Sequence, residues 1–232
     1  MSFEFISNAT QNKLKNREPW LAQKNNHNII DVSLCAGQMI IPGSDDKHFF
    51  PLAERLHLFN KELSRLFPYI TFYGVDYLHS TLLTLFNDSE TAFTNARFEI
   101  KKLCQKTLAH FIRYQPINIA LQDVLLTPNG SIILMGKSQE LLDFRQEIYS
   151  TYNFPDCLKK DIIHITLGRL LQNETVENME AINNYLTIQG TLHLPSVTVN
   201  SPKIIISRDT HCFNIDTELT LDFNSAIESV SF

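Results

Sequence analysis

The sequence predicts an α+β fold with two antiparallel sheets, flanked by helices and arranged as two lobes around a central cleft. Helical and strand patterns alternate along the chain, and strands joined by tight turns occur in both halves. This arrangement favours antiparallel sheets over a doubly wound parallel sheet. The 232 residues, 44% of them hydrophobic, suffice for a core of that size. We assign residues 29–232 to one bilobal domain, and the polar residues 1–28 to an N-terminal arm or a loosely packed first helix.

In the first half, apolar residues change from a strand-like to a helical spacing. Between 52 and 66, leucines and Phe59 recur every three or four residues, which indicates an amphipathic helix. Asp88 and Ser89 offer an N-cap for a long helix that ends near Ile112. The predicted strands of this half are 29–36, 69–73 and 77–86, with a turn-rich stretch at 42–51 and a break at Gly74.

The second half repeats this pattern. Thr127-Pro128-Asn129-Gly130 is a turn signal between the strands 117–126 and 131–135. Ser138 can cap a helix that runs to Tyr149, and a second helix is expected over 176–186. The other predicted strands are 162–171, 192–200, 203–207, 212–215 and 219–223.

Charge and composition exclude several classes of protein. Twenty basic and 25 acidic residues leave a net charge of −5, which argues against long duplex nucleic acid as a partner. No apolar run reaches the ~20 residues of a membrane-spanning helix, and the N-terminus does not resemble a secretory signal. The four cysteines form no C-x-x-C pair, and the histidines show no metal-ligand spacing. We expect a cytoplasmic protein with no membrane partner and no metal site. The sequence leaves the oligomeric state open and favours a monomer.

An internal repeat carries the chemistry. The segment DYLHSTLLTL, 76–85, aligns without gaps on DIIHITLGRL, 161–170, and half of the ten positions are identical. Residues two apart on a strand point to the same face. His79 and Thr81 therefore project together, as do His164 and Thr166. If a pseudo-two-fold relates the lobes, the two imidazoles face each other across the cleft.

Two histidines and two threonines on one surface suit phosphodiester cleavage. A neutral imidazole removes a proton from the attacking water or ribose hydroxyl, while a protonated imidazole supplies one to the departing oxygen. The threonine hydroxyls can donate hydrogen bonds to the non-bridging phosphate oxygens. The sequence does not say which histidine is the base, because that depends on the polarity of the substrate.

The segments HSTL at 79–82 and HITL at 164–167 resemble the paired H-x-[ST]-x motifs of the two-histidine (2H) phosphoesterase superfamily. That superfamily includes RNA 2′,3′-cyclic phosphodiesterases, once called 2′–5′ RNA ligases, and phosphodiesterases of cyclic nucleotides and of 2′–5′ oligonucleotides. The resemblance covers about residues 29–223. It implies metal-independent hydrolysis without a cofactor, with His79, His164, Thr81 and Thr166 as catalytic residues.

The substrate expected from this resemblance is a nucleotide, an RNA end with a 2′,3′-cyclic phosphate or a short oligonucleotide linkage. One position departs from the pattern, since Ser80 stands where the superfamily usually has an apolar residue. Ser80 should point away from the cleft, so we expect a difference in packing rather than in chemistry.

Two further residues are candidates for substrate binding. Tyr77 shares strand parity with His79 and could stack on a base, and Arg208, after the strand 203–207, could supply a positive charge. Arg169 has the wrong parity to lie beside Thr166 unless a bulge intervenes.

Two other classes of function stay open at the level of sequence. The cleft could bind a cyclic or terminal phosphate without cleaving it. Alternatively, the chain could be an interaction protein that uses residues 1–28. Loss of turnover on replacing either motif histidine would separate an enzyme from a binder. Deletion of residues 1–28 would leave turnover unchanged if the protein is an enzyme, and would remove partner binding if that arm is the interaction site.

Overall fold

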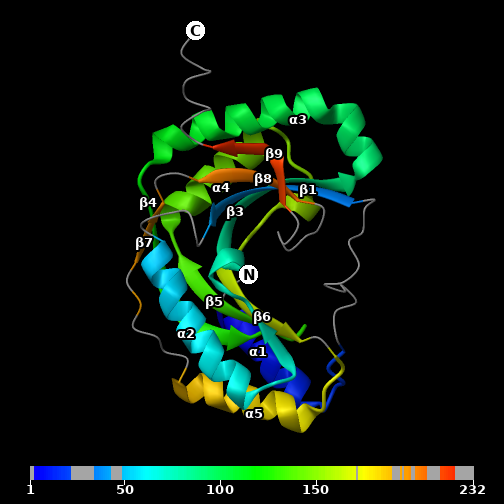
Figure 1. Cartoon of the computed structure of the whole chain (residues 1–232), viewed down its shortest axis with the longest axis vertical. Coiled ribbons are helices and arrows are strands. Elements are labelled where there is room, and N and C mark those ends of the chain that lie inside the picture. The colour runs from blue at the N-terminus through cyan, green and yellow to red at the C-terminus, as the bar shows by residue number, and fades with distance from the viewer. Residues whose placement is uncertain are drawn as a thin grey trace.

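The computed structural model describes residues 3–21, 34–42, 49–170, 172–189, 194, 196–199, 202–207 and 215–222 (Figure 1). The helices of these ranges are α1 (Phe3–Lys15), α2 (Phe50–Leu66), α3 (Glu90–Phe111), α4 (Gln139–Thr151) and α5 (Val176–Gln189). The short 3₁₀ turns are η1 (Val75–Tyr77), η2 (Ile112–Tyr114) and η3 (Asp156–Leu158). The strands are β1 (Leu34–Pro42), β2 (Ile70–Phe72), β3 (His79–Ser89), β4 (Ile117–Leu126), β5 (Ser131–Lys137), β6 (Ile163–Leu170), β7 (Val197–Val199), β8 (Lys203–Ser207) and β9 (Ile215–Asp222).

The strands pair antiparallel in the order β7-β4-β5-β6-β3-β1-β8-β9, and β2 also pairs with β6. Figure 1 shows them as two blocks: an upper block of β1, β3, β8 and β9 beneath α3, and a lower block around β4, β5 and β6 with α2 and α5. The α+β class and the antiparallel pairing are confirmed, but the described strands form one continuous nine-stranded sheet, of which these blocks are two halves, where two separate sheets were expected. The blocks are joined through a single described residue pair, Ser80 with Ile165, between β3 and β6.

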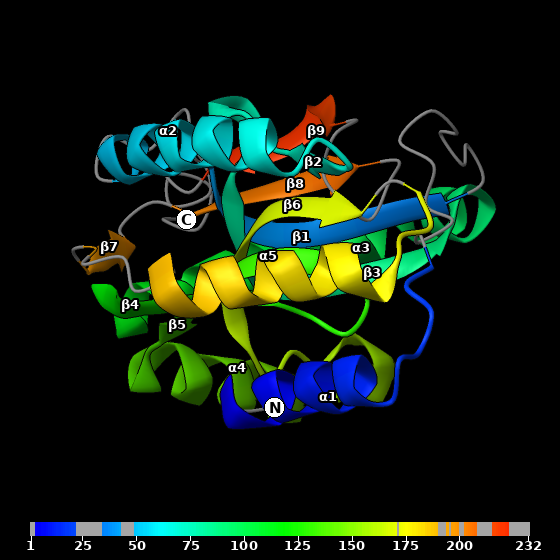
Figure 2. The ribbon, with the colours of Figure 1, turned by 90° about the horizontal axis from the view of Figure 1, so that it is seen from below.

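Side chains alternate between the two faces of the central strands in the lower block. Ile132 and Leu134 of β5 lie in the main core together with Ile165 of β6. Ile133 and Met135, the intervening residues of β5, pack on the other face against Ile6 of α1. Figure 2, seen from below, shows α2 and α1 on opposite sides of the strands.

The described part of the predicted N-terminal arm packs on the body of the protein. The Thr10 hydroxyl donates to the carbonyl of Leu126 at 2.8 Å, and Lys13 Nζ donates to the carbonyl of Pro128 at 2.9 Å. Trp20 is buried, and the backbone N–H of Glu174 donates to its carbonyl. Helix α1 is therefore a packed layer of the fold, and deletion of residues 1–28 would expose Ile133 and Met135 to solvent.

Most predicted elements of the second half occur where the sequence places them. β4 and β8 match their predicted ranges, and the hydroxyl of Ser138 accepts from the N–H of Leu141 as the N-cap of α4. The strand predicted over 29–36 lies partly outside the described residues, and β1 continues to Pro42. β7 is shorter than predicted, and β9 is continuous where two strands were expected, with 212–214 and 223 outside the described residues.

Within the described ranges, no helix combines the length and apolar character that a membrane crossing requires.

Candidate active site

The two repeated motifs meet where the blocks of strands join. Ser80, at the centre of the first motif, pairs antiparallel with Ile165, at the centre of the second. Continuing this register by one residue in each direction brings His79 beside Thr166, and Thr81 beside His164. The two motifs are therefore related by a local two-fold axis through the β3–β6 pair.

All four motif side chains share one face of this pair. The central residues Ser80 and Ile165 are each 2% exposed and turn toward the core. The alternating histidine and threonine positions are half-buried and lie on the opposite face. The prediction that Ser80 points away from the candidate site is confirmed by its burial.

His79 has a defined orientation. Its Nδ1 lies 2.9 Å from the backbone carbonyl of Tyr77. A carbonyl oxygen can only accept, so Nδ1 carries the hydrogen, and proton exchange with a substrate would take place at Nε2. η1 sets this geometry, since it turns the chain so that the Tyr77 carbonyl faces back toward the ring.

His164 lies in a different environment. Burial is the largest cause that lowers the pKa of His164 from 6.5 to about 3. The ring keeps part of its surface open, but protein atoms surround most of it. Nearby positive charges also lower this pKa, those of Lys160, His79, Arg145 and Arg169. The electrostatic effect of His79 on His164 agrees with the register in placing the two imidazoles near each other.

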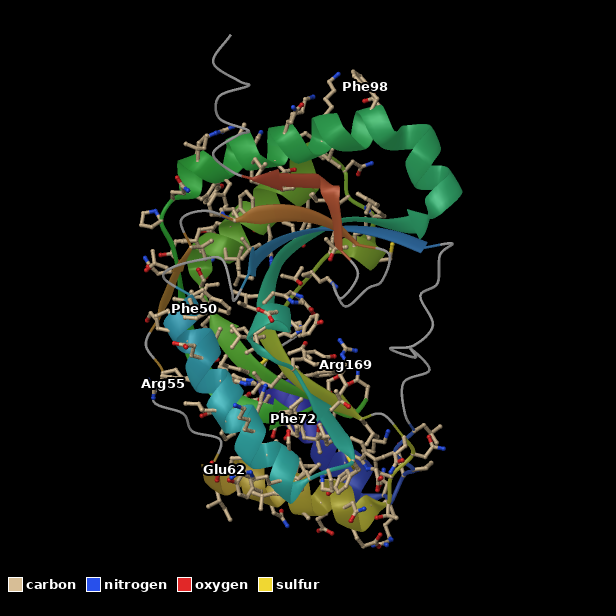
Figure 3. All side chains as sticks on the ribbon, in the orientation of Figure 1. Phe50, Arg55, Glu62, Phe72, Phe98 and Arg169 are labelled. Carbon is tan, nitrogen blue, oxygen red and sulfur yellow. The ribbon has the colours of Figure 1, made fainter. Side chains whose placement is uncertain are left out.

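A bulge in β6 brings Arg169 to the same face. Ile133 pairs with Thr166 and Ile132 pairs with Gly168, so Leu167 is the extra residue. A Cβ at Gly168 would lie 2.7 Å from the carbonyl oxygen of Thr71, which explains the glycine at this crowded place. Because of the extra residue, Arg169 returns to the side of Thr166, and Figure 3 shows it on β6 near the middle of the molecule.

From strand parity, Arg169 was not expected beside Thr166 unless a bulge intervened, and the bulge at Leu167 is that exception. The available signal was Gly168, since a glycine within a strand often marks a bulge. Arg145 was also missed, although it stands four residues after the buried Leu141 and three before the buried Ile148. A charged residue on the inner face of a helix is a sign of a specific buried partner.

The two predicted substrate-binding residues have different outcomes. Tyr77 belongs to η1 and not to the strand, which begins at His79, so the parity argument for it is wrong. Hydrogen bonds from the N–H groups of Tyr77 and Leu78 back to Gly74 and Val75 close this turn. The Tyr77 side chain is 46% exposed beside the first motif. Arg208 lies outside the described residues.

No family model and no curated protein matches the chain. Among solved structures, it is similar to a conserved protein of unknown function, ATU0111, from Agrobacterium tumefaciens, with 10% identity and a TM-score of 0.56 over 90% of this chain and 95% of that chain. It is similar to TT0787 of Thermus thermophilus, with 16% identity and a TM-score of 0.44 over 74% and 87%. It is also similar to Escherichia coli LigT complexed with phosphate, with 16% identity and a TM-score of 0.46 over 82% and 94%.

The likeness to ATU0111 shows that the fold as a whole recurs in a solved protein. The resemblance to the two-histidine phosphoesterases rests on the paired H-x-T motifs of the sequence.

Proposed function

We propose that this protein is a metal-independent phosphodiesterase that acts on a nucleotide, an RNA end with a 2′,3′-cyclic phosphate or a short oligonucleotide linkage. One observation carries the proposal. The antiparallel pairing of Ser80 with Ile165 sets two H-x-T motifs from different halves of the chain side by side on one face. Two imidazoles and two hydroxyls are then available to a single phosphate group.

The reaction needs one neutral and one protonated histidine. We assign His164 as the base, because burial lowers its pKa and keeps the ring neutral, with a nitrogen that can accept a proton. It takes the proton of the attacking water or ribose hydroxyl, whose oxygen forms the new bond to phosphorus. The bond to the departing oxygen breaks, and Nε2 of His79 gives that oxygen its proton. One proton is gained at His164 and one is lost from His79, so the step balances.

The phosphate oxygens are held by neutral and charged donors. In this register, Thr166 lies beside His79 and Thr81 lies beside His164. Both threonine hydroxyls donate hydrogen bonds to non-bridging oxygens of the phosphate. Arg169, on the same face, supplies a positive charge for the phosphate. The exposed ring of Tyr77 stacks on a base, and Arg208 is proposed as a second cation on the strength of the sequence alone.

The test is turnover of a substrate panel in EDTA. The panel holds 2′,3′-cyclic nucleotides, 3′,5′-cyclic nucleotides, and 2′–5′ and 3′–5′ dinucleotides. We expect hydrolysis of at least one class by the wild type, with losses of roughly 10³-fold or more in His79→Ala and His164→Ala, because each removes a proton-transfer group.

His110→Ala is the matched control for loss of a histidine. His110 lies on α3, where it bonds to Glu147 and contacts Tyr152 and not the motif residues. Its replacement should therefore leave turnover unchanged. If a member of the panel binds but is not hydrolysed, the protein is a binding protein and not an enzyme. Equal activity in His164→Ala and the wild type would refute the proposed mechanism.

A further inference from the structure

A buried guanidinium lies behind the candidate site and has no part in the proposed reaction. Arg145 of α4 is 1% exposed. Its Nε donates to the carbonyl of Leu82 at 2.7 Å, and its Nη2 donates to that of Thr81 at 3.1 Å. Its Nη1 donates to the carbonyls of Ile162 at 2.9 Å and Lys160 at 3.4 Å. One side chain thus bonds to the strand of the first motif and to the residues that lead into the second.

Direct pairing between the two motif strands is very short. In the described strands, β5 and β6 share six residue pairs, whereas β3 and β6 share only one. A single pair leaves the angle and spacing of the two motifs weakly determined. α4 contacts β4 of the lower block and β3 of the upper block, so a residue on this helix can hold both.

Burial of a charged group is costly unless its donors are satisfied. Arg145 meets this condition with four backbone carbonyls, and the negative charge of Asp161 also favours its charged form. The planar fork of the guanidinium reaches four acceptors in directions that a lysine, with one nitrogen, cannot reproduce. The arrangement therefore stabilises one relative placement of the two strands.

We propose that Arg145 is a positioning residue that holds the two H-x-T motifs at the distance and angle required for shared action on one phosphate. This inference rests on the proposed function for its kinetic consequences. Its structural part, the clamp between Thr81 and Ile162, stands on the hydrogen bonds alone.

The kinetic test compares Arg145→Met, Arg145→Lys and Phe144→Leu. Phe144 is the preceding residue of α4, fully buried against Phe111 and Tyr114, and it controls for general damage to this helix. At equal folded fraction, we expect Arg145→Met to lose about 100-fold in kcat with little change in KM, as for a misplacement of catalytic groups by about 1 Å. Arg145→Lys should recover part of this loss, and Phe144→Leu should stay within about threefold of the wild type.

A second readout does not depend on turnover. The positive charge of Arg145 lowers the pKa of His164, as do those of Lys160, His79 and Arg169. NMR titration of the His164 ring should therefore show a higher pKa in Arg145→Met, where the charge is lost. Arg145→Lys keeps the charge but not the forked hydrogen bonds, so we expect its His164 pKa to differ from that of Phe144→Leu, because the two strands are displaced. If Arg145→Met does not fold, Arg145→Gln takes its place in both measurements.

The two proposals fail separately. No turnover by the wild type on any substrate refutes the proposed function, and the His164 titration of Arg145→Lys then decides the clamp. Arg145→Met that matches Phe144→Leu in kcat overturns the role of Arg145. Where there is no turnover to compare, a His164 pKa in Arg145→Lys equal to that in Phe144→Leu overturns it. A loss in Arg145→Met that Arg145→Lys partly restores supports it.

Discussion

Two histidines in equivalent sequence motifs have unequal surroundings. His79 donates through Nδ1 to the Tyr77 carbonyl, which leaves Nε2 directed elsewhere. His164 is enclosed by protein, and its pKa is lowered to about 3. Acid–base catalysis needs one neutral and one protonated imidazole, and unequal surroundings favour that division of protonation states. The local symmetry places the residues, and their neighbours give them different roles.

At the residue scale, Arg169→Gln should weaken substrate binding. Loss of a charge-assisted hydrogen bond to phosphate costs roughly 1.5–3 kcal/mol, so we expect KM to rise about 10- to 100-fold. Steady-state kinetics on the best substrate of the panel measure this. The matched control is Arg113→Gln, because Arg113 is an exposed arginine that pairs with Glu147. An unchanged KM in Arg169→Gln would remove Arg169 from the site.

At the scale of elements, the bulge in β6 connects backbone geometry with chemistry. A regular strand would place Arg169 on the core face, where a guanidinium could not be buried without partners. The extra residue Leu167 changes the alternation, and Gly168 makes room for the carbonyl of Thr71 and the ring of Phe72. A second element, α4, also positions a charged side chain: its inner face carries Arg145 to the junction of the two blocks.

Gly168→Ala tests this element. Its Cβ would lie 2.7 Å from the Thr71 oxygen and 2.8 Å from the Phe72 ring, so β2 must move. We expect a loss of about 1–3 kcal/mol in the free energy of unfolding, measured by urea denaturation, together with a higher KM as Arg169 shifts. Gly74→Ala is the control, since nothing lies within 4 Å of a Cβ there. Equal stability of the two variants would contradict the crowding at Gly168.

At the scale of the whole molecule, a shared core extends under both blocks and holds them together where β3 and β6 pair only briefly. Leu82 of β3, Leu167 of β6 and Phe144 of α4 belong to the same buried cluster. The candidate site lies on the opposite face of this junction. Protonation within the site is therefore coupled to the stability of the fold as a whole.

The stability of the protein should fall as the pH falls from 6.5 toward 3. The folded-state pKa of His164 is depressed to about 3, whereas in the unfolded chain it is about 6.5. Between these values the unfolded state binds the additional proton, so acid favours unfolding. Urea denaturation at several pH values measures this dependence. His164→Gln should show a weaker dependence in this window, and an identical slope in both proteins would contradict the lowered pKa.

Several features followed from the sequence because they depend on local geometry. The period of two on β3 and β6 places each histidine with its threonine, and Ser138 caps α4 through a hydroxyl three residues from its partner N–H. The turn between β4 and β5 needed only its own residues, including Gly130 with a φ of 80°. In each of these features, the residues that interact are close to one another in the sequence.

Other features were decided by contacts between distant segments. Strand parity alone misplaced Arg169, since the bulge exists only through pairing with β5 and crowding against β2. The helical residues 3–15 looked like an arm because their partners, Ile133 and Leu126, are more than a hundred positions away. The sequence by itself determined which residues form the two motifs and which way each one faces. Only the tertiary structure decided that the motifs meet, and which charges surround them, because register and burial arise from residues that the chain does not place side by side.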